Sequence, residues 1–339
     1  MTPYERIHTQ LQGKPVDKVP NLNILMAFAA EFINVSFDKF CLDYRYLVEA
    51  NIKCNEYFGI DMLNTMSDAF RETYDFGAEI KFPYDNLPIS KIHFIQGPED
   101  IKKLKIFDPL NSTRILDRIR AVELFKKETG NNYSILGWVE GSFAEAADLR
   151  GVSEIMYDLY DEPEFVKDMM SICCEEGIMC AKEQIKAGAD FIGVGDAVAS
   201  LISPALYREF VLPFEQKLFK EIHDAGAKVK LHICGNISNI LDDIWQSGAD
   251  IIDIDFMVDF KTAIQKFKGH PACANGNFDP VRTLKNGTPE SIRQAVMDCL
   301  SVADERTFIS AGCEVPKNTP YENLKAVDDA LKMQYNTSF

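Results

Sequence analysis

The sequence predicts a single α/β domain over residues 1–339, a (β/α)8 TIM barrel with a long excursion after the second strand. Two observations lead to this fold class. Short apolar runs of β-like composition alternate with longer helical patterns, which is typical of parallel strands joined by crossover helices. The alternation provides eight predicted strands, and a chain of 339 residues with eight strand–helix pairs favours a closed barrel over an open sheet.

The predicted strands cover the whole chain, and helix signals separate them. Pro163 begins a helical pattern that ends at Gly188, and Ser203-Pro204 begins another that ends near Gly226. The first βα loop contains no G-x-G-x-x-G, so a dinucleotide site there is unsupported. We expect strands at residues 19–25, 60–65, 133–139, 190–195, 228–233, 250–255, 271–275 and 306–310.

Residues 66–132 form a segment that is too long for one crossover helix. We interpret it as an insertion that covers the barrel mouth, with its own strand pair in AEIKF and KIHFI. A docking element or lid and a purely structural cap are both compatible with the sequence.

Composition excludes several classes of function. The formal net charge of −16, without a basic tract, argues against nucleic-acid binding. No apolar run reaches the roughly 18 residues of a spanning helix, and the N-terminal stretch MTPYERIHTQLQGK has the pattern of an amphipathic helix. We therefore expect a cytoplasmic protein without a membrane segment, whose nine cysteines are reduced.

Polar and metal-binding side chains gather where the predicted strands end. His232 and Cys234 lie two positions apart on the fifth strand, so both side chains point to the same face. Cys313 follows the eighth strand, and a barrel brings its rim positions close together. One imidazole and two thiolates suit Zn²⁺ and leave a tetrahedral position open. The other strand ends carry Glu140, Asp196, Asp253, Asp255, Asn275 and Asn277.

Ordinary structural roles are the alternative for each of these residues. Taken alone, H-x-C also describes a core histidine beside a core cysteine. Asp253 and Asp255 are also compatible with carboxylates that cap neighbouring strand ends. The remaining cysteines that we weighed lie in helical or core patterns and are expected to be packing residues: Cys54, Cys173, Cys174, Cys180, Cys273 and Cys299.

With these positions in hand, the chain resembles the uroporphyrinogen decarboxylase superfamily from about residue 5 to residue 333. The likeness is densest in GADFIGVGDAVASLISPALYREFVLPF and continues through Asp255 and GNFDP at 276–280. Decarboxylases of this superfamily bind a polycarboxylate tetrapyrrole with an arginine-rich first loop and an essential aspartate. Asp68 is similar to that aspartate, but the first loop ILMAFAAEFINV has no arginine to bind carboxylates.

The corrinoid-dependent methyltransferases are the other branch of the superfamily, and they include methylcobalamin:coenzyme M methyltransferases. Their mark is H-x-C followed some seventy to eighty residues later by a cysteine in a Gly-Cys context, and His232, Cys234 and Cys313 match it. The resemblance implies zinc-dependent transfer of a methyl group from methylcobalamin or a corrinoid carrier protein to a zinc-bound thiol, such as coenzyme M or homocysteine.

The resemblance and the strand ends together give the expected site. We expect His232, Cys234, Cys313 and Asp196 to be catalytic. Glu140, Asp196 and Asp255 are candidates for a fourth zinc ligand or for the partner of the imidazole. The residues expected near the corrinoid are Met26, Phe28, Phe32, Asp68 and Asn277.

Two other functions are compatible with the sequence. One is a metal-free decarboxylase of the uroporphyrinogen type that uses Asp68. The other is a sensor that binds a corrinoid or a thiol without turnover. For the methyltransferase, the expected partners are a corrinoid carrier protein and a small thiol, and the sequence leaves a homodimer open.

Overall fold

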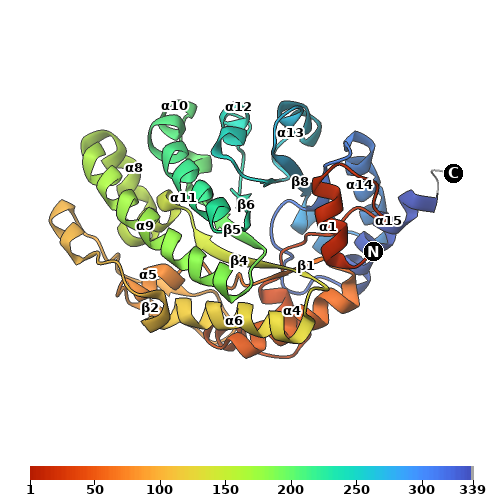
Figure 1. Cartoon of the computed structure of the whole chain (residues 1–339), viewed down its shortest axis with the longest axis horizontal. Coiled ribbons are helices and arrows are strands. Elements are labelled where there is room, and N and C mark those ends of the chain that lie inside the picture. The colour runs from red at the N-terminus through yellow and green to blue at the C-terminus, as the bar shows by residue number, and fades with distance from the viewer. Residues whose placement is uncertain (337–339) are drawn as a thin grey trace.

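The computed structural model describes residues 1–336, and its centre is a curled sheet of seven parallel strands surrounded by helices (Figure 1). Neighbouring strands pair in the order β1-β4-β5-β6-β7-β8-β9, so each strand lies beside the next one along the chain. This arrangement confirms the predicted TIM-barrel-like class. The strands are β1 (Met62–Asn64), β4 (Ser134–Glu140), β5 (Phe191–Gly195), β6 (Lys228–His232), β7 (Ile251–Ile254), β8 (Cys273–Phe278) and β9 (Phe308–Ala311).

The prediction of a strand at 19–25 is wrong. This segment makes one isolated parallel bridge, between Asn21 and Ile309 of β9, and the Asn21 carbonyl accepts a hydrogen bond from the residue before β1. The Asn23 side chain, not the backbone, accepts the hydrogen bond of the Ala311 N–H (2.9 Å). Asparagine side chains thus replace ladder bonds, and the segment fills the place between β9 and β1 without forming a regular strand.

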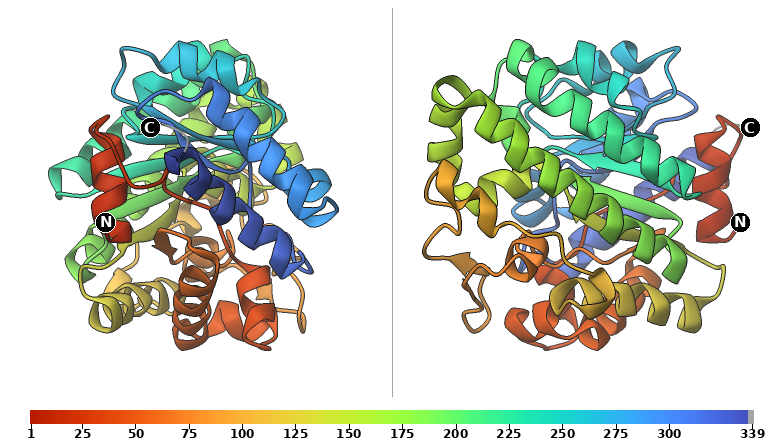
Figure 2. Two further views of the ribbon diagram at one scale, coloured as in Figure 1. Left: turned by 90° about the vertical axis from the view of Figure 1, so that its right-hand side faces the viewer. Right: turned by 60° about the vertical axis from the view of Figure 1, so that its left-hand side comes forward.

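Helices connect the strands on the outside of the sheet, and α14 and α15 lie side by side (Figure 2). No helix within residues 1–336 is both long enough and apolar enough to cross a bilayer. Those before β4 are α1 (Pro3–Leu11), α2 (Ala27–Phe32), α3 (Phe37–Leu42), α4 (Tyr44–Phe58), α5 (Arg71–Asp75), η1 (Pro98–Lys103), η2 (Pro109–Asn111) and α6 (Arg114–Thr129). Those after it are α7 (Ser142–Arg150), α8 (Val152–Asp161), α9 (Pro163–Ala187), η3 (Ala197–Leu201), α10 (Pro204–Leu206), η4 (Tyr207–Val211), α11 (Leu212–Asp224), α12 (Leu241–Ile244), η5 (Trp245–Ser247), α13 (Phe260–Phe267), η6 (Pro280–Lys285), α14 (Pro289–Val302) and α15 (Tyr321–Asn336).

The helix boundaries follow the capping signals in the sequence. The Ser203 hydroxyl accepts a hydrogen bond from the Leu206 N–H at the start of α10, and the helix continues through η4 and α11 to Asp224. At the end of α9, Gly188 has a φ of 116°, which side chains other than glycine rarely adopt. The N-terminal amphipathic helix is α1, and its Ile7 packs among the inward-facing apolar residues of the strands.

The excursion between β1 and β4 contains α5, a small hairpin, η1, η2 and α6. The hairpin pairs β2 (Ile80–Lys81) with β3 (Ile89–Ser90), so its second strand precedes the predicted run at 91–95. The reason is the tight turn at residues 83–86, closed by a hydrogen bond from the Asn86 N–H to the Pro83 carbonyl, because a hairpin turn sets the register of its strands. That residues 66–132 act as a cap on the mouth remains a prediction.

The barrel interior has a large aromatic side chain for which neighbouring glycines leave room. Trp138 of β4 is 2% exposed, and a Cβ atom added at Gly193 of β5 would lie 2.3 Å from its ring. At Gly195 the added Cβ would lie 2.9 Å from the same ring. The repeated glycine in DFIGVGD is therefore a packing requirement of the tryptophan, which reaches toward the carboxyl ends of the strands.

Substitution of Gly193 by alanine should destabilise the barrel. The new methyl group must displace the Trp138 ring, and overpacking of this kind costs about 1–3 kcal/mol. Gly177→Ala in α9 is the matched control, since its Cβ would have no neighbour closer than 3.8 Å and helical alanine is favoured over glycine. Urea unfolding should show a lower midpoint for Gly193→Ala only; equal midpoints for the two variants would contradict this packing argument.

Candidate metal centre

Three side chains of types that can bind metal ions meet at the carboxyl ends of β6 and β9. The His232 Nε2 atom lies 2.9 Å from the Cys234 Sγ atom and 3.8 Å from the Cys313 Sγ atom. The two sulfur atoms are 3.5 Å apart, although the residues are separated by 79 positions in the chain. Within residues 1–336, this is the one group of three or more His, Cys, Asp or Glu side chains whose ligand atoms lie close enough together to hold a metal ion.

Local backbone structure brings the sulfur atoms together. After Cys234 the chain turns at Gly235, which has a φ of 95° and whose N–H donates to the Asp255 carboxylate (3.0 Å). Gly312 precedes Cys313 and lies against the backbone that follows β7, where an added Cβ would be 2.4 Å from the Phe256 nitrogen. Gly235 therefore permits a backbone conformation that other residues rarely adopt, and Gly312 permits a close approach that a side chain would prevent.

The imidazole ring is oriented by a buried carboxylate. The His232 Nδ1 atom lies 2.7 Å from one Asp253 oxygen, and the other oxygen accepts a hydrogen bond from the Asn275 amide (2.7 Å). Lys230, two residues before His232 on the same face of β6, forms a buried ion pair with Asp253. Although burial opposes ionisation, the Lys230 ammonium and these hydrogen bonds hold the pKa of Asp253 below its ordinary range. The carboxylate thus holds Nδ1 as a hydrogen-bond donor and orients the ring so that Nε2 faces the sulfur atoms.

The Cys313 thiol is the more acidic of the two. A hydrogen bond from Cys234 and the nearby His232 ring together lower the pKa of Cys313 to about 4, against the opposing effect of burial. A thiolate at this position is the form that binds metal ions.

A cavity of about 300 Å³ lies above the three side chains. Apolar side chains from different parts of the chain form most of its wall, and two carboxyl groups also reach it. Its lining residues are Ile24, Met26, Met66, Ala69, Leu87, Trp138, Glu140, Gly195, Ala197, His232, Cys234, Cys313 and Glu314. The metal-binding atoms are therefore accessible to a small ligand from a largely apolar space.

Comparison with known proteins agrees with this architecture. The uroporphyrinogen decarboxylase (URO-D) family model matches residues 2–333, nearly the whole chain. The chain belongs to the URO-D family. A solved structure described as a methyltransferase from Methanosarcina mazei has the same fold, with a TM-score of 0.90 over 99% of each chain at 24% sequence identity.

The chain is similar in sequence to relatives of two kinds, methyltransferases and uroporphyrinogen decarboxylases. The methylcobamide:CoM methyltransferase MtbA of Methanosarcina acetivorans is 28% identical, with 98% of each chain covered. The methylated-thiol–coenzyme M methyltransferase of Methanosarcina mazei is also 28% identical, over 98% of this chain and 89% of the relative. A uroporphyrinogen decarboxylase of Carboxydothermus hydrogenoformans is 24% identical over 88% of this chain and 87% of its own length.

The other carboxylates that the sequence suggested as metal ligands have different partners in this URO-D fold. Asp255 accepts hydrogen bonds from the Gly235 and Met257 N–H groups, so it shapes the turn after Cys234 and does not contact the imidazole. Asp196 accepts a hydrogen bond from the Ala144 N–H at the start of α7 (2.9 Å). Burial raises the pKa of Asp196 to about 7.

Glu140 is the one of these carboxylates that reaches the cavity. It accepts a hydrogen bond from the Trp138 indole N–H (2.8 Å), and its pKa is raised well above the ordinary value by burial and by the nearby Glu72 and Asp148 carboxyl groups. It lines the cavity beside the metal-binding side chains without belonging to their group of three.

Three residues that the sequence placed near a corrinoid do not line the cavity with the histidine and the two cysteines. Phe28 is fully buried, its ring 5.5 Å from that of Phe58, and Phe32 packs into the same aromatic cluster, because the chain after Met26 turns into helix α2. Asn277 donates hydrogen bonds to the carbonyl groups of the loop after β7 and lines a different surface hollow. Of the three first-loop residues expected near the corrinoid, only Met26 lines the cavity.

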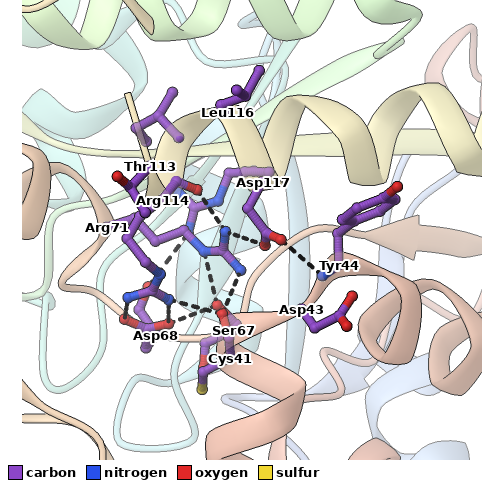
Figure 3. Close-up of polar contacts among 12 residues, drawn as sticks. Cys41, Asp43, Tyr44, Ser67, Asp68, Arg71, Thr113, Arg114, Leu116 and Asp117 are labelled. Atoms are coloured by element: carbon purple, nitrogen blue, oxygen red, sulfur yellow. Dashed lines mark hydrogen bonds and ion pairs between the residues drawn. The ribbon is translucent and has the colours of Figure 1, made fainter. Parts of the chain in front are cut away.

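Asp68 is not free to bind a substrate. Its carboxylate accepts hydrogen bonds from the Arg114 guanidinium (2.6 Å) and the Ser67 hydroxyl (2.7 Å), and both ionic partners are 2% exposed (Figure 3). Arg71 joins the same cluster through Ser67 and through Asp117 of α6. Asp68 does not line the cavity, so the structure assigns it to a buried ion pair that joins α6 to the end of β1.

Sequence reasoning missed four residues of the site. Asp253 was named only as a strand-end residue, and Lys230, Trp138 and Glu314 received no role. The signal for Lys230 was present, because positions 230 and 232 lie on the same face of β6. Trp138 gives the same signal, because it lies two positions before Glu140 on β4. Glu314 directly follows Cys313, but this adjacency does not indicate that its side chain reaches the cavity.

Proposed function

We propose that this protein is a zinc-dependent methyltransferase that moves a methyl group from a methylated corrinoid to a small thiol. The observation that carries the proposal is the convergence of His232, Cys234 and Cys313 beneath an accessible apolar cavity. The relatives named for methylcobamide:CoM methyl transfer support the same reaction class.

The three side chains fit a zinc ion. Tetrahedral bonds of about 2.3 Å to sulfur and about 2.0 Å to nitrogen place the ligand atoms about 3.5–3.8 Å apart. The sulfur–sulfur distance of 3.5 Å and the Cys313–His232 distance of 3.8 Å already match this range, whereas Cys234 must move away from the ring by less than about 1 Å. Asp253 supplies the carboxylate that commonly supports a metal-binding histidine.

The residues of the chain prepare the methyl acceptor for attack. Zinc held by one neutral imidazole and two thiolates would favour the deprotonated form of an acceptor thiol while leaving its sulfur electron-rich. Asp253 keeps the imidazole in the orientation that this requires, and the apolar wall above it limits access of water. The thiol releases its proton, its sulfur forms a bond to the methyl carbon, and both electrons of the broken cobalt–carbon bond remain on cobalt, so Co(III) becomes Co(I).

The corrinoid would approach over the cavity, where Met26, Met66 and Leu87 provide apolar surface for a flat macrocycle. Leu87 belongs to the β2–β3 hairpin, which also exposes Tyr84, Ile89 and Ile92. We propose that this hairpin, within the 66–132 excursion, contacts a corrinoid carrier protein. Exposed apolar side chains in one cluster are typical of a protein-interaction surface.

Removal of the metal should abolish the activity. We expect the zinc-loaded protein to convert methylcobalamin and a thiol into Co(I) cobalamin and the methyl thioether, followed by the corrinoid spectrum and by detection of the thioether under anaerobic conditions. Chelation should reduce the rate by more than about 100-fold, because the acceptor sulfur loses the cation that stabilises its thiolate, and stoichiometric zinc should restore it.

The corrinoid spectrum also separates turnover from simple binding. A spectrum that changes on mixing but yields no thioether would favour a corrinoid-binding sensor. Full activity in the zinc-free protein would overturn the proposal.

A further inference from the structure

The cavity above the metal-binding side chains has carboxyl groups but no cation. Glu140 and Glu314 both line it, and within residues 1–336 none of its lining residues is lysine or arginine. Glu140 has a partner in the Trp138 indole N–H. The Glu314 Oε2 atom is buried and makes no hydrogen bond with any residue that the structure describes.

An unpartnered buried carboxyl oxygen is unfavourable unless a ligand supplies a donor. Burial removes the hydrogen bonds that water would make, and this loss typically costs about 1–3 kcal/mol until a donor replaces them. Glu314 directly follows Cys313 and lines the same cavity as both sulfur atoms, where an acceptor thiol would bind. A small ligand anchored by its sulfur therefore brings its other end close to this oxygen.

The charged residues of the cavity wall indicate which chemical group the ligand carries at the end opposite its sulfur, here called its tail. A sulfonate or phosphate needs arginine or lysine as a partner, and the cavity wall offers neither. The two carboxyl groups that line the cavity supply no positive charge to replace such a partner. An ammonium group, by contrast, gives Glu314 both a hydrogen-bond donor and an opposite charge.

We propose that the methyl acceptor is a small aminothiol, with an amine that binds Glu314, and not a thiol with an anionic tail. This inference rests on the proposed methyltransferase function and specifies its substrate class. The methyl group passes from cobalt to the sulfur of the aminothiol, the thiol proton is released, the electron pair stays on cobalt, and the amine takes no part in bond formation.

Three thiols that differ only in the tail test the inference. Cysteamine, 2-mercaptoethanol and 2-mercaptoethanesulfonate carry a cationic, a neutral and an anionic group on the same two-carbon chain. For each thiol, the kcat/KM for methylcobalamin demethylation is divided by the rate constant of the uncatalysed reaction between that thiol and methylcobalamin. We expect this normalised kcat/KM to be highest for cysteamine. In Glu314→Gln the ratio of kcat/KM for cysteamine to that for the sulfonate should fall by about 10-fold or more, the effect of losing one charged partner.

The comparison is internally controlled because each thiol is measured in both proteins, so its intrinsic reactivity cancels. Glu290→Gln, an exposed substitution on α14, should leave the ratio as it is in the unmodified protein. A wild-type preference for the sulfonate, or an unchanged ratio in Glu314→Gln, overturns the inference while the methyltransferase function stands. No turnover with any of the three thiols overturns the proposed function, and the inference falls with it.

Discussion

Cys313→Ser should lose its zinc and its methyl-transfer activity together. A serine hydroxyl is a poor zinc ligand because it stays protonated at neutral pH, so two ligands remain where the site needs three. Loss of an outer-shell partner typically costs 10- to 100-fold, and loss of a ligand should exceed this. We expect metal analysis to show zinc falling from about one per chain toward background, with the rate reduced by more than about 100-fold.

Cys299→Ser is the matched control for this substitution. Cys299 is also buried, but it lies on α14 with its sulfur 3.9 Å from the Asn277 side chain and does not reach the cavity. It should retain zinc and activity, and circular dichroism should show that both variants are folded. If Cys313→Ser kept stoichiometric zinc and turned over methylcobalamin normally, the three-ligand centre would be refuted.

The convergence of the three side chains could be predicted because it depends on two regular geometries. Alternation along a strand places His232 and Cys234 on the same face, and a closed barrel brings the ends of distant strands to one rim. Both rules act on backbone periodicity, so they need no knowledge of side-chain packing. For the same reason the order and direction of seven of the eight predicted strands agree with the structure.

The partner of the imidazole could not be chosen from the sequence. Asp253 and Asp255 lie two positions apart on and after β7, and alternation alone directs both side chains to the same face. The strand ends at Ile254, however, so the backbone of Asp255 already belongs to the following turn, where it binds N–H groups. A one-residue difference in strand length therefore decides which carboxylate contacts His232, and strand ends are the least predictable feature of a sequence.

In the first loop, packing against distant residues determines where two aromatic side chains lie, and composition alone does not predict this. Phe28 and Phe32 were expected to contact a macrocycle because they are aromatic and follow the first predicted strand. In the structure they turn away and pack with Phe58, Tyr57 and Tyr321, in ring pairs with centroids about 5–6 Å apart. The partners come from α4 and from α15, and α15 lies at the opposite end of the sequence, so no pattern within the loop itself indicates this cluster.

Arg114→Met should be among the most destabilising substitutions in the protein. Arg114 donates to the Asp68 carboxylate and to the Cys41 carbonyl in a region closed to solvent (Figure 3). Removal of one partner of a buried ion pair leaves the other charge uncompensated, which typically costs 3–5 kcal/mol, about the upper range for a single substitution. We expect a clearly lower urea midpoint at neutral pH.

The size of this effect should depend on pH. Although burial opposes ionisation, the Arg114 and Arg71 guanidinium groups lower the pKa of Asp68 to about 2. A carboxyl group whose pKa is lower in the folded than in the unfolded state stabilises the fold when the pH is above its unfolded-state pKa. This stabilisation is lost as the pH falls through its folded-state pKa. Without Arg114, burial favours the protonated form of Asp68. The stability of the variant should therefore come closer to that of the wild type in acid. The difference between their midpoints should therefore be largest at about pH 7 and smaller at about pH 4.

The double variant Asp68→Asn/Arg114→Met separates loss of the charge pair from loss of packing. An asparagine carries no charge, so the double variant should be more stable than Arg114→Met alone by about 1–3 kcal/mol, within the range of coupling energies for residues in contact. Asp68→Asn by itself should retain methyl transfer within a few-fold, because Asp68 does not line the cavity. A methyl-transfer rate abolished by Asp68→Asn in a folded protein would return this carboxylate to the active site. A double variant no more stable than Arg114→Met would refute the unpaired charge as the cause of the Arg114 effect.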